Sequence, residues 1–257
     1  MLSYQHAYHA GNLADLQKHG LLAWMLAYLT RKEKPLSYLE THAGRGIYDL
    51  SSSEALKTAE AASGIHAHAD WFAADHPVSK CYDATIQAHG PSAYPGSPMI
   101  AAHLLRPQDS LHLAELHPGE YQALRDSFRR AAKTYLQDGF EMAHALAPPT
   151  PRRGLLLIDP PYEIKSDYTV IPGHVSKLTR AWNVGIIALW YPILTSDAHH
   201  PMLDSLSGKF PDALRHEVYF PPARPGHGMI GSGMFVINPP YGLQGEATRL
   251  SALFERL

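Results

Sequence analysis

Residues 155–163, LLLIDPPYE, join an aliphatic run to Asp159, two prolines and Tyr162. The run predicts a buried strand that ends at the carboxylate, because proline removes an N–H donor and stops strand pairing. An Asp159 oxygen and the free Pro160 carbonyl can together accept both protons of an exocyclic amino group. This arrangement would direct the lone pair of the amino nitrogen at an electrophile, and Tyr162 can stack on a base swung out of its helix.

A similar stretch, MFVINPPYG at residues 234–242, carries Asn238 and Tyr241 in the matching positions. The last two predicted strands, ALRHEVYF and GMFVINPP, are joined by PPARPGHGMIGS, which is too short for a helical crossover. The last strand is therefore predicted to be antiparallel, with its end at the edge of the sheet away from the other strand ends. Its start, the loop GHGMIGSG at 226–233, should reach the ligand edge, so we expect the first copy to be the working site.

Strands alternate with helices along most of the chain, which predicts an α/β fold with a mostly parallel, doubly wound sheet. Apolar residues at helical spacing predict a helix over residues 13–31 with Asn12 as its N-cap. Residues 47–93 contain two helical stretches with no strand between them. We therefore expect a small inserted helical subdomain at 47–93, and a main domain formed by 1–46 and 94–257.

Further polar residues follow the other predicted strands, where ligands bind in doubly wound sheets. Gly44 and Gly46 in ETHAGRG allow a tight turn against a ligand, but the third glycine of the dinucleotide fingerprint is missing. Glu115 could accept both hydroxyl protons of a ribose, or could be an exposed acid that caps the helix beginning near Pro118. Asp138 in QDGF could accept from the amino group of an adenine, or could belong to a simple Asp-Gly turn.

The chain has 257 residues, 45% of them hydrophobic, and a formal net charge of −2. This composition predicts one large globular domain and argues against a general nucleic-acid coat protein, which would be strongly basic. Local basic patches remain possible at Arg31, Lys32 and Lys34, at Arg129, Arg130 and Lys133, and at Arg152 and Arg153. The first group follows the N-terminal helix and is the expected contact for phosphates.

Cys81 is the only cysteine, so no disulfide can form within the chain, and a reduced, cytoplasmic protein is expected. The start of the chain does not resemble a signal peptide, and the longest apolar helical segment, GLLAWMLAYL, is too short to cross a bilayer. The histidine groups at 66–68 and 199–200 lack an acidic or cysteine partner at helical spacing. We therefore expect neither a membrane nor a metal as a partner.

The glycine turn, the acid after the second strand and DPPY together resemble S-adenosylmethionine (SAM)-dependent amino-methyltransferases of Rossmann-like class I. The segments MLSYQHAYHAGNLADLQKH, THAGRG, YPGSP, ELHP, DGF, RRGLLLIDPPYE, ALWYP and GSGMFVINPPY resemble, in order, the RlmJ family, which methylates N6 of an adenine in 23S ribosomal RNA. The resemblance covers almost the whole chain and is weakest at 47–93. It implies a mostly parallel seven-stranded sheet with an antiparallel last strand, SAM as cofactor, and a monomer acting on free or early-assembly 23S rRNA.

The resemblance also implies roles for individual residues. Around the methionine end of SAM it places Lys18, His19, His42 and Ser97. Around the rest of the cofactor it places Gly44, Gly46, Glu115, Asp138, Gly139 and Asp159. The catalytic residues would be Asp159, Pro160 and Tyr162, and the substrate would contact Tyr4 and Tyr162.

The expected mechanism is direct in-line transfer, in which neutral adenine N6, oriented by Asp159 and the Pro160 carbonyl, attacks the sulfonium methyl and loses its proton afterwards. An N6-adenine DNA methyltransferase, or a protein linked to the use of external DNA, is the nearest alternative, because DPPY also serves on DNA. No separate DNA-reading domain is evident. A non-catalytic nucleotide- or RNA-binding scaffold and an NAD-dependent oxidoreductase are the remaining alternatives.

Overall fold

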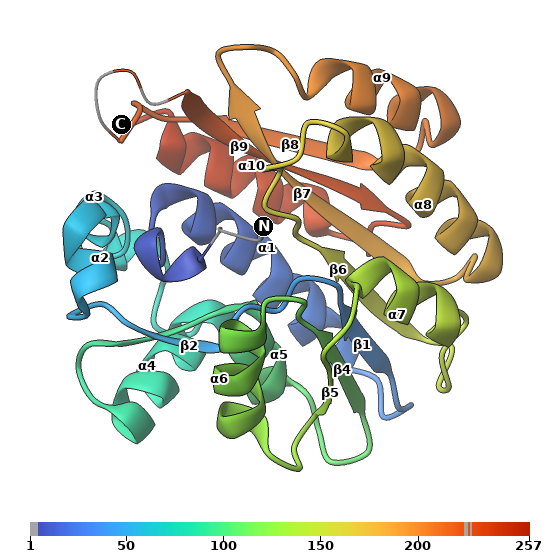
Figure 1. Ribbon diagram of the computed structural model, residues 1–257, viewed down its shortest axis with the longest axis horizontal. Coiled ribbons are helices and arrows are strands. Elements are labelled where there is room, and N and C mark those ends of the chain that lie inside the picture. Colours follow the sequence, from blue (N-terminus) through green and yellow to red (C-terminus); the bar gives the residue numbers. More distant parts are fainter. Residues whose placement is uncertain (1–4, 224–225, 227) are drawn as a thin grey trace.

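The computed structural model describes residues 5–223, 226 and 228–257, which are built around a seven-stranded sheet (Figure 1). The strand order is β5-β4-β1-β6-β7-β9-β8. The strands are β1 Ser37–Glu40, β4 Ser110–Ala114, β5 Lys133–Tyr135, β6 Gly154–Ile158, β7 Ile186–Leu194, β8 Leu214–Tyr219 and β9 Met229–Ile237. Neighbouring strands from β5 to β7 are parallel, whereas β9 is antiparallel to both β7 and β8. The predicted sheet, with its antiparallel last strand, is confirmed.

Three short strands have no counterpart among the strands predicted from the sequence. One is β5, at the edge of the main sheet. The other two, β2 Ile47–Asp49 and β3 Ala93–Pro95, pair antiparallel in a separate two-stranded sheet. Each has only three residues, which is too few for an alternating or continuously apolar pattern to become visible.

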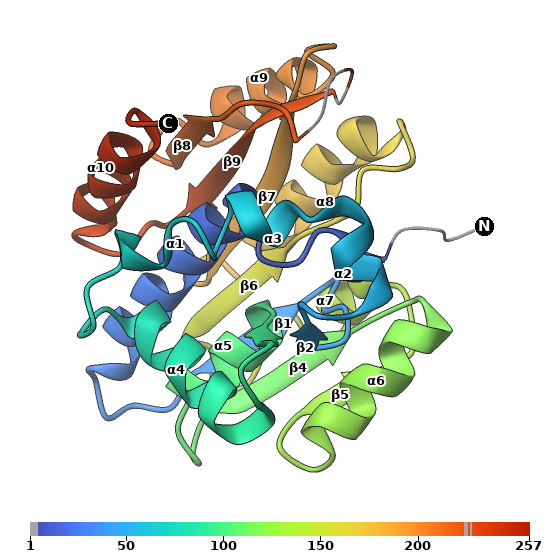
Figure 2. The same ribbon diagram turned by 90° about the vertical axis from the view of Figure 1, so that its left-hand side faces the viewer.

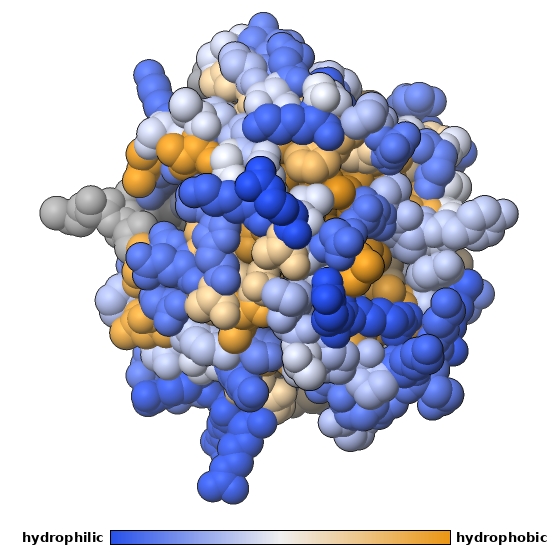
Figure 3. Space-filling view, turned by 90° about the vertical axis from the view of Figure 1, so that its right-hand side faces the viewer, coloured by the Kyte–Doolittle hydropathy of each residue, from blue (hydrophilic) through white to orange (hydrophobic). Residues whose placement is uncertain are grey.

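Helices cover both faces of the main sheet (Figures 1 and 2). The helices on one side are α1 Leu13–Thr30, α4 Pro77–His89, α5 Ser97–Leu104, α6 Pro118–Phe128 and α10 Leu243–Phe254. The helices on the other side are α7 Gly139–Leu146, α8 Asp167–Ala181 and α9 His200–Lys209. Two apolar clusters fill the layers between the helices and the sheet. On the face of the molecule shown in Figure 3, hydrophobic residues lie in small groups that hydrophilic residues separate.

Helix α1 is enclosed by the rest of the protein, with residues buried around its whole circumference from Leu13 to Ala23. It packs against α4, α5, α10 and β9. The side chain of Asn12 accepts a hydrogen bond from the Asp15 backbone N–H at 2.9 Å, which confirms the predicted N-cap. Its apolar segment is thus part of the protein core, and no helix in the described part of the chain is long and apolar enough to cross a membrane.

Residues 47–93 contain β2 and the helical elements α2 Ser53–Thr58, α3 Glu60–Ser63, η2 Ala69–Trp71 and α4. A further short helix, η1 His6–Tyr8, precedes α1 and contacts α2. Figure 2 shows α2 and α3 beside the start of α1. The division into a main domain and an insertion at 47–93 stays a prediction, but the segment has extensive contacts with the chain on both sides of it.

Trp182 is a central residue of the apolar cluster that α8 covers. Its ring is fully buried, and its indole N–H donates to the Arg152 carbonyl. A Cβ at Gly185 would lie 2.4 Å from the ring, so the neighbouring backbone is fitted closely to it. We expect Trp182→Ala to lower the free energy of unfolding by about 3–5 kcal/mol, because it leaves a cavity.

Urea denaturation measures this change, and Tyr241→Ala is the matched control. The Tyr241 side chain is 90% exposed, so its removal should change stability by no more than about 0.5 kcal/mol. Equal effects of the two substitutions would contradict the assigned packing.

Candidate active site

The C-terminal ends of β1, β4, β6 and β7 border one cavity of about 550 Å³. Most residues that the sequence analysis selected lie in its wall: Lys18, His19, His42, Gly44, Ser97, Glu115, Asp138, Gly139, Asp159, Pro160 and Tyr162. Gly46 lies outside this wall, and a Cβ there would meet the Phe128 ring at 2.6 Å. Tyr4 falls outside the described residues.

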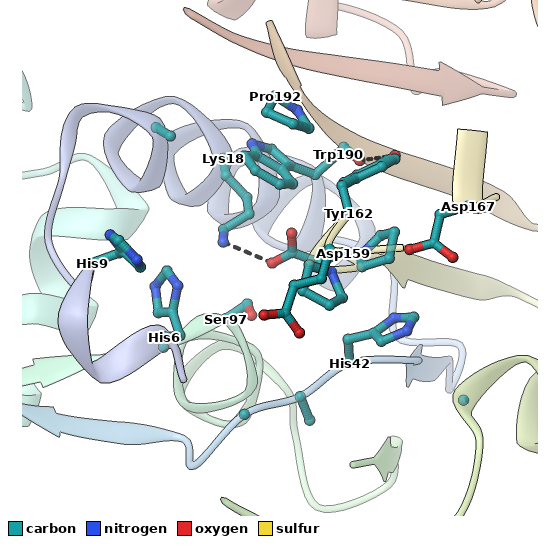
Figure 4. Close-up of a pocket in the computed structure, with 18 of the residues that line it drawn as sticks. His6, His9, Lys18, His42, Ser97, Asp159, Tyr162, Asp167, Trp190 and Pro192 are labelled. Atoms are coloured by element: carbon teal, nitrogen blue, oxygen red, sulfur yellow. Dashed lines mark hydrogen bonds and ion pairs between the residues drawn. The ribbon is translucent and has the colours of Figure 1, made fainter. Parts of the chain in front are cut away.

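Asp159 lies immediately after β6 and is held by an ion pair. Its Oδ2 is 2.7 Å from Lys18 Nζ, which is also 3.1 Å from Asp15 Oδ1 (Figure 4). Lys18 is 5% exposed, and its ammonium lies 5.5 Å from the centre of the Trp190 ring. Lys18 was expected around the methionine end of the cofactor, but in this structure it contacts the proposed catalytic carboxylate directly.

Tyr162 closes the DPPY turn in a left-handed backbone conformation, with φ +54°. Its hydroxyl donates to the Trp190 carbonyl at 2.8 Å, and its ring stacks on Tyr168 with centroids 4.7 Å apart. Burial raises the pKa of the Tyr162 phenol well above its ordinary value, so the hydroxyl remains a donor. These contacts fix an aromatic surface next to Asp159 (Figure 4).

Glu115 ties the ends of β1 and β4 together. Its two oxygens accept backbone hydrogen bonds from Gly44, at 2.8 Å, and from His117, at 2.7 Å. Burial raises the pKa of its carboxyl group above the ordinary value. The cap of α6 is His117, whose Nδ1 accepts from the first N–H groups of that helix, so the alternative of Glu115 as the helix cap is wrong. Glu115 instead holds the glycine turn in place.

Asp138 and Gly139 form the start of α7 beside the cavity. The Asp138 Oδ1 caps the helix by accepting from the backbone N–H groups of Phe140 and Glu141 at 2.8 and 3.0 Å. A Cβ on residue 139 would lie 1.9 Å from the Thr41 carbonyl oxygen, so only glycine allows α7 to approach the end of β1 this closely. Both residues therefore have structural roles, alongside the cofactor contacts expected from the resemblance.

Glu40, at the end of β1, is a buried acid to which sequence reasoning gave no role. It accepts hydrogen bonds from the Ser97 hydroxyl, at 2.5 Å, and from the Tyr38 hydroxyl, at 2.8 Å. Burial raises the pKa of Glu40 to about 8, although both hydrogen bonds act in the opposite direction. Its position in ETHAGRG, at the end of a predicted strand, could have identified it as a residue near the site.

Of the two selected histidines, His19 is buried and His42 is half-buried, and both are neutral at ordinary pH. Burial lowers the pKa of His42 to about 4 and that of His19 to about 3. His42 Nδ1 lies 2.7 Å from the Thr41 hydroxyl, and His19 Nδ1 lies 3.1 Å from the Tyr94 hydroxyl. Both can therefore act as hydrogen-bonding groups without bringing charge to the cavity.

The two ends of β9 lie at the edges of the sheet that the sequence predicts, although residues 229–233, which were predicted as a loop, form the start of the strand. Met229 pairs with Leu194 at the end of β7, and residues 228 and 229 line the cavity. At the other end, Ile237 pairs with Ile187 near the start of β7. The Asn238 side chain there donates to the carbonyls of residues 183 and 185, at 3.1 and 2.8 Å. The second proline-rich copy thus lies at the opposite edge of the sheet, where it serves as a turn.

The basic group Arg31, Lys32 and Lys34 is not part of the cavity wall. Lys18 and Arg31 are 13 residues apart on and just beyond α1, or roughly 20 Å along a helix. The group therefore lies near the end of this helix that is away from the cavity. This position does not support the expected contact with phosphates of a bound substrate.

The histidine pair at 199–200 has an acidic neighbour after all. Asp197, His199 and His200 place possible metal-ligand atoms within 4.8 Å of one another. The side chains of Asp197 and His200 are largely exposed, whereas His199 is buried. The sequence analysis found no acidic partner for these histidines, and that point is wrong; its expectation of no bound metal stays a prediction.

The sheet topology, together with the glycine turn and acid at the ends of β1 and β4, defines a SAM-dependent methyltransferase of the Rossmann-like class. The family model described as "Ribosomal RNA large subunit methyltransferase D, RlmJ" matches residues 33–256, and the chain belongs to this family.

Relatives of known name cover nearly the whole chain. Ribosomal RNA large subunit methyltransferase J of Escherichia coli K12 is 41% identical, over 95% of this chain and 89% of that protein. The protein of the same name from Haemophilus influenzae is 39% identical over the same shares. A crystal structure of a Legionella pneumophila protein is similar with a TM-score of 0.83 and 36% identity, covering 96% of this chain and 92% of that chain.

The cofactor of this class is SAM, and the residues present suit it. The cavity has the size of an ordinary small-molecule site. Gly44 has φ +60°, and its N–H is fixed by Glu115, so the turn beside the cavity is already formed. Carboxylates at the ends of β4 and β6 and neutral histidines supply polar groups without excess positive charge.

We expect the stability of the protein to depend on pH through Glu40. Its pKa of about 8 in the folded state lies above the ordinary value of 4.5, so the folded protein binds more protons than the unfolded chain between these values. This contribution to stability is fully present below about pH 4.5 and is lost as the pH rises through 8. Glu40→Gln removes the titrating group, and its unfolding free energy should fall less over this range.

Urea denaturation at several pH values tests this expectation. The exposed acid Glu141 provides the control, since Glu141→Gln should keep the pH dependence of the wild type. Parallel curves for Glu40→Gln and the wild type would show that Glu40 is already ionised in the folded protein.

Proposed function

We propose that this protein transfers a methyl group from SAM to N6 of an adenine in 23S ribosomal RNA. The observation that carries the proposal is Asp159, which follows β6 in DPPY, is paired with Lys18 and borders a cavity suited to the cofactor. The relatives named as large-subunit rRNA methyltransferases support the substrate class. The proposal includes a cytoplasmic monomer acting on free or early-assembly RNA.

The cofactor is held, in this proposal, between the ends of β1 and β4. Gly44 and Glu115, and Asp138 and Gly139 at the start of α7, line the cavity there. SAM supplies an electrophilic methyl group on a sulfonium sulfur. The hydrogen bonds already made by Glu115 and Asp138 fix the surrounding backbone before any ligand arrives.

Asp159 orients the amino group of the target base. Lys18 holds Asp159 through Oδ2, and the carboxylate can accept an amino proton while the Pro160 carbonyl accepts the other. This fixes the nitrogen lone pair in one direction, and such positioning is worth roughly 7–11 kcal/mol in well-oriented reactions. Asp159 need not be a strong base, because the amine loses its proton readily once it is alkylated.

Aromatic side chains beside Asp159 provide a place for the base itself. Tyr162 and Trp190 both line the cavity, with their ring centroids 6.1 Å apart. A base removed from its stack can regain stacking energy on such surfaces. Pro192 and Met229 add apolar surface to the same cavity wall.

Substitution of Asp159 tests its proposed role. We expect Asp159→Ala to lower methyl transfer by about 100-fold or more, because the amino group loses its fixed orientation. SAM affinity should stay within a few-fold of the wild type, as measured by calorimetry. Asn238→Ala, the same position in the second copy, should leave turnover almost unchanged. Equal loss of transfer and SAM binding in Asp159→Ala would instead make Asp159 mainly a cofactor ligand.

The substrate class is tested with labelled SAM, offered separately with unmodified 23S rRNA and with duplex DNA and followed by nucleoside analysis. We expect labelled N6-methyladenosine from the RNA alone. Label in the DNA alone would overturn the proposed substrate, and absence of label in both, with SAM still bound, would contradict activity on free RNA.

A further inference from the structure

Residues 5–12, here called the N-terminal segment, run beside the cavity and contact residues 47–93, of which Tyr48 and Glu60 also line the cavity. His6, His9 and Asn12 of this segment contribute to the cavity wall. Figure 4 shows His6 and His9 near Lys18, on the side of the cavity formed by the start of α1. A segment at this place can affect the site only if something holds it there, and several of its partners belong to residues 47–93.

Glu60, at the start of α3, binds two side chains of the N-terminal segment at once. Its Oε1 lies 2.9 Å from His9 Nδ1, and its Oε2 accepts from the Asn12 side-chain amide at 3.0 Å. Glu60 is 9% exposed. A carboxylate that uses both oxygens in this way fixes the distance and the orientation between two segments about 50 residues apart in sequence.

The backbones of the two segments also meet directly. The Ile65 N–H donates to the Gly11 carbonyl at 2.8 Å, and the Thr58 hydroxyl donates to the Tyr8 carbonyl. A Cβ at Gly64 would lie 2.0 Å from the Gly11 oxygen, so this approach requires glycine. The contact is therefore closely fitted over several residues, with Glu60 as its charged group.

A continuous series of contacts leads from Glu60 to the proposed catalytic carboxylate. Asn12, held by Glu60, caps α1 by accepting from the Asp15 N–H, and the Gly11 N–H donates to Asp15 Oδ2 at 2.9 Å. Asp15 pairs with Lys18, and Lys18 pairs with Asp159. Displacement of residues 11 and 12 would thus change the partners of Asp15 and, through it, the place of the Lys18 ammonium.

We propose that Glu60 is a positioning residue for the methyl transfer, and that residues 47–93 serve to hold the N-terminal segment against the active site. This inference rests on the proposed function of the cavity. Glu60 acts through His9 and Asn12, which fix the start of α1 and so the Lys18–Asp159 pair. The contact with Glu60 also keeps His9 at the cavity wall.

Three substitutions distinguish the effect of the length of the Glu60 side chain from the effect of its charge. Glu60→Ala removes both acceptors. Glu60→Asp keeps the charge but is one methylene shorter, so it cannot contact His9 and Asn12 together. Glu60→Gln keeps the length, can accept from Asn12 and can donate to a neutral His9. Asp83→Asn is the matched control, because Asp83 is an exposed acid on α4 of the same segment.

The first readout is amide hydrogen exchange in the full-length protein. We expect exchange at residues 9–12 to rise about tenfold or more in Glu60→Ala and Glu60→Asp, while β6 stays as protected as in the wild type. Glu60→Gln and Asp83→Asn should exchange like the wild type. Unchanged protection at residues 9–12 in Glu60→Ala would overturn the proposal.

The second readout is transfer to 23S rRNA, with kcat and KM measured separately. We expect kcat to fall about tenfold or more in the Ala and Asp variants, with recovery in Gln, while SAM affinity stays within about twofold. Parallel losses of kcat, SAM affinity and protection throughout the protein would indicate a merely structural role and would overturn the proposal.

The two readouts also separate this inference from the function on which it rests. If the wild-type protein transfers no methyl group to RNA, the proposed function fails, and hydrogen exchange still decides whether Glu60 holds the N-terminal segment. If the wild type is active and the Ala variant retains full kcat, the function stands and the positioning role of Glu60 is overturned.

Discussion

The ion pair between Lys18 and Asp159 is the interaction on which the rest of the site depends. It joins the first long helix to the end of the central strand β6, two elements 141 residues apart in sequence. Removal of two charges from water costs several kcal/mol for each ion, so such a pair persists only where further polar partners are supplied. Asp15 supplies one for Lys18, which makes the start of α1 part of the candidate active site as well as of the core.

The remaining carboxylates at this edge of the sheet hold backbone and hydroxyl groups in place. Glu115 fixes the glycine turn, Asp138 caps α7, and Glu40 accepts from Ser97 and Tyr38. Because these acids already have partners, the cavity wall is arranged before a ligand binds, and little energy is lost in ordering it. A cofactor site of this kind depends on shape and on fixed hydrogen-bonding groups more than on net charge.

The segment 47–93 is connected to the same set of contacts. Its Glu60 holds the residues that precede α1. The N-terminal segment, α1 and β6 therefore form one connected set of contacts from the surface to Asp159. This connection is the basis of the proposed positioning role of Glu60.

The sequence by itself determined the order of the main elements and the edge of the sheet where the site lies. Apolar runs, prolines and glycine turns are local signals, and a short link between the last two strands forces them to be antiparallel. These signals distinguished Asp159 from Asn238, although the roles of the selected residues in catalysis stay predictions. Three-residue strands such as β5 carried too little pattern to be found.

Only the tertiary structure decided which partner each charged side chain meets. The contact of Lys18 with Asp159, the buried state of Glu40 and the link from Glu60 to His9 join residues far apart in sequence. Local propensity contains no information on such pairs, because burial and electrostatic partners are set by the packing of distant elements against one another.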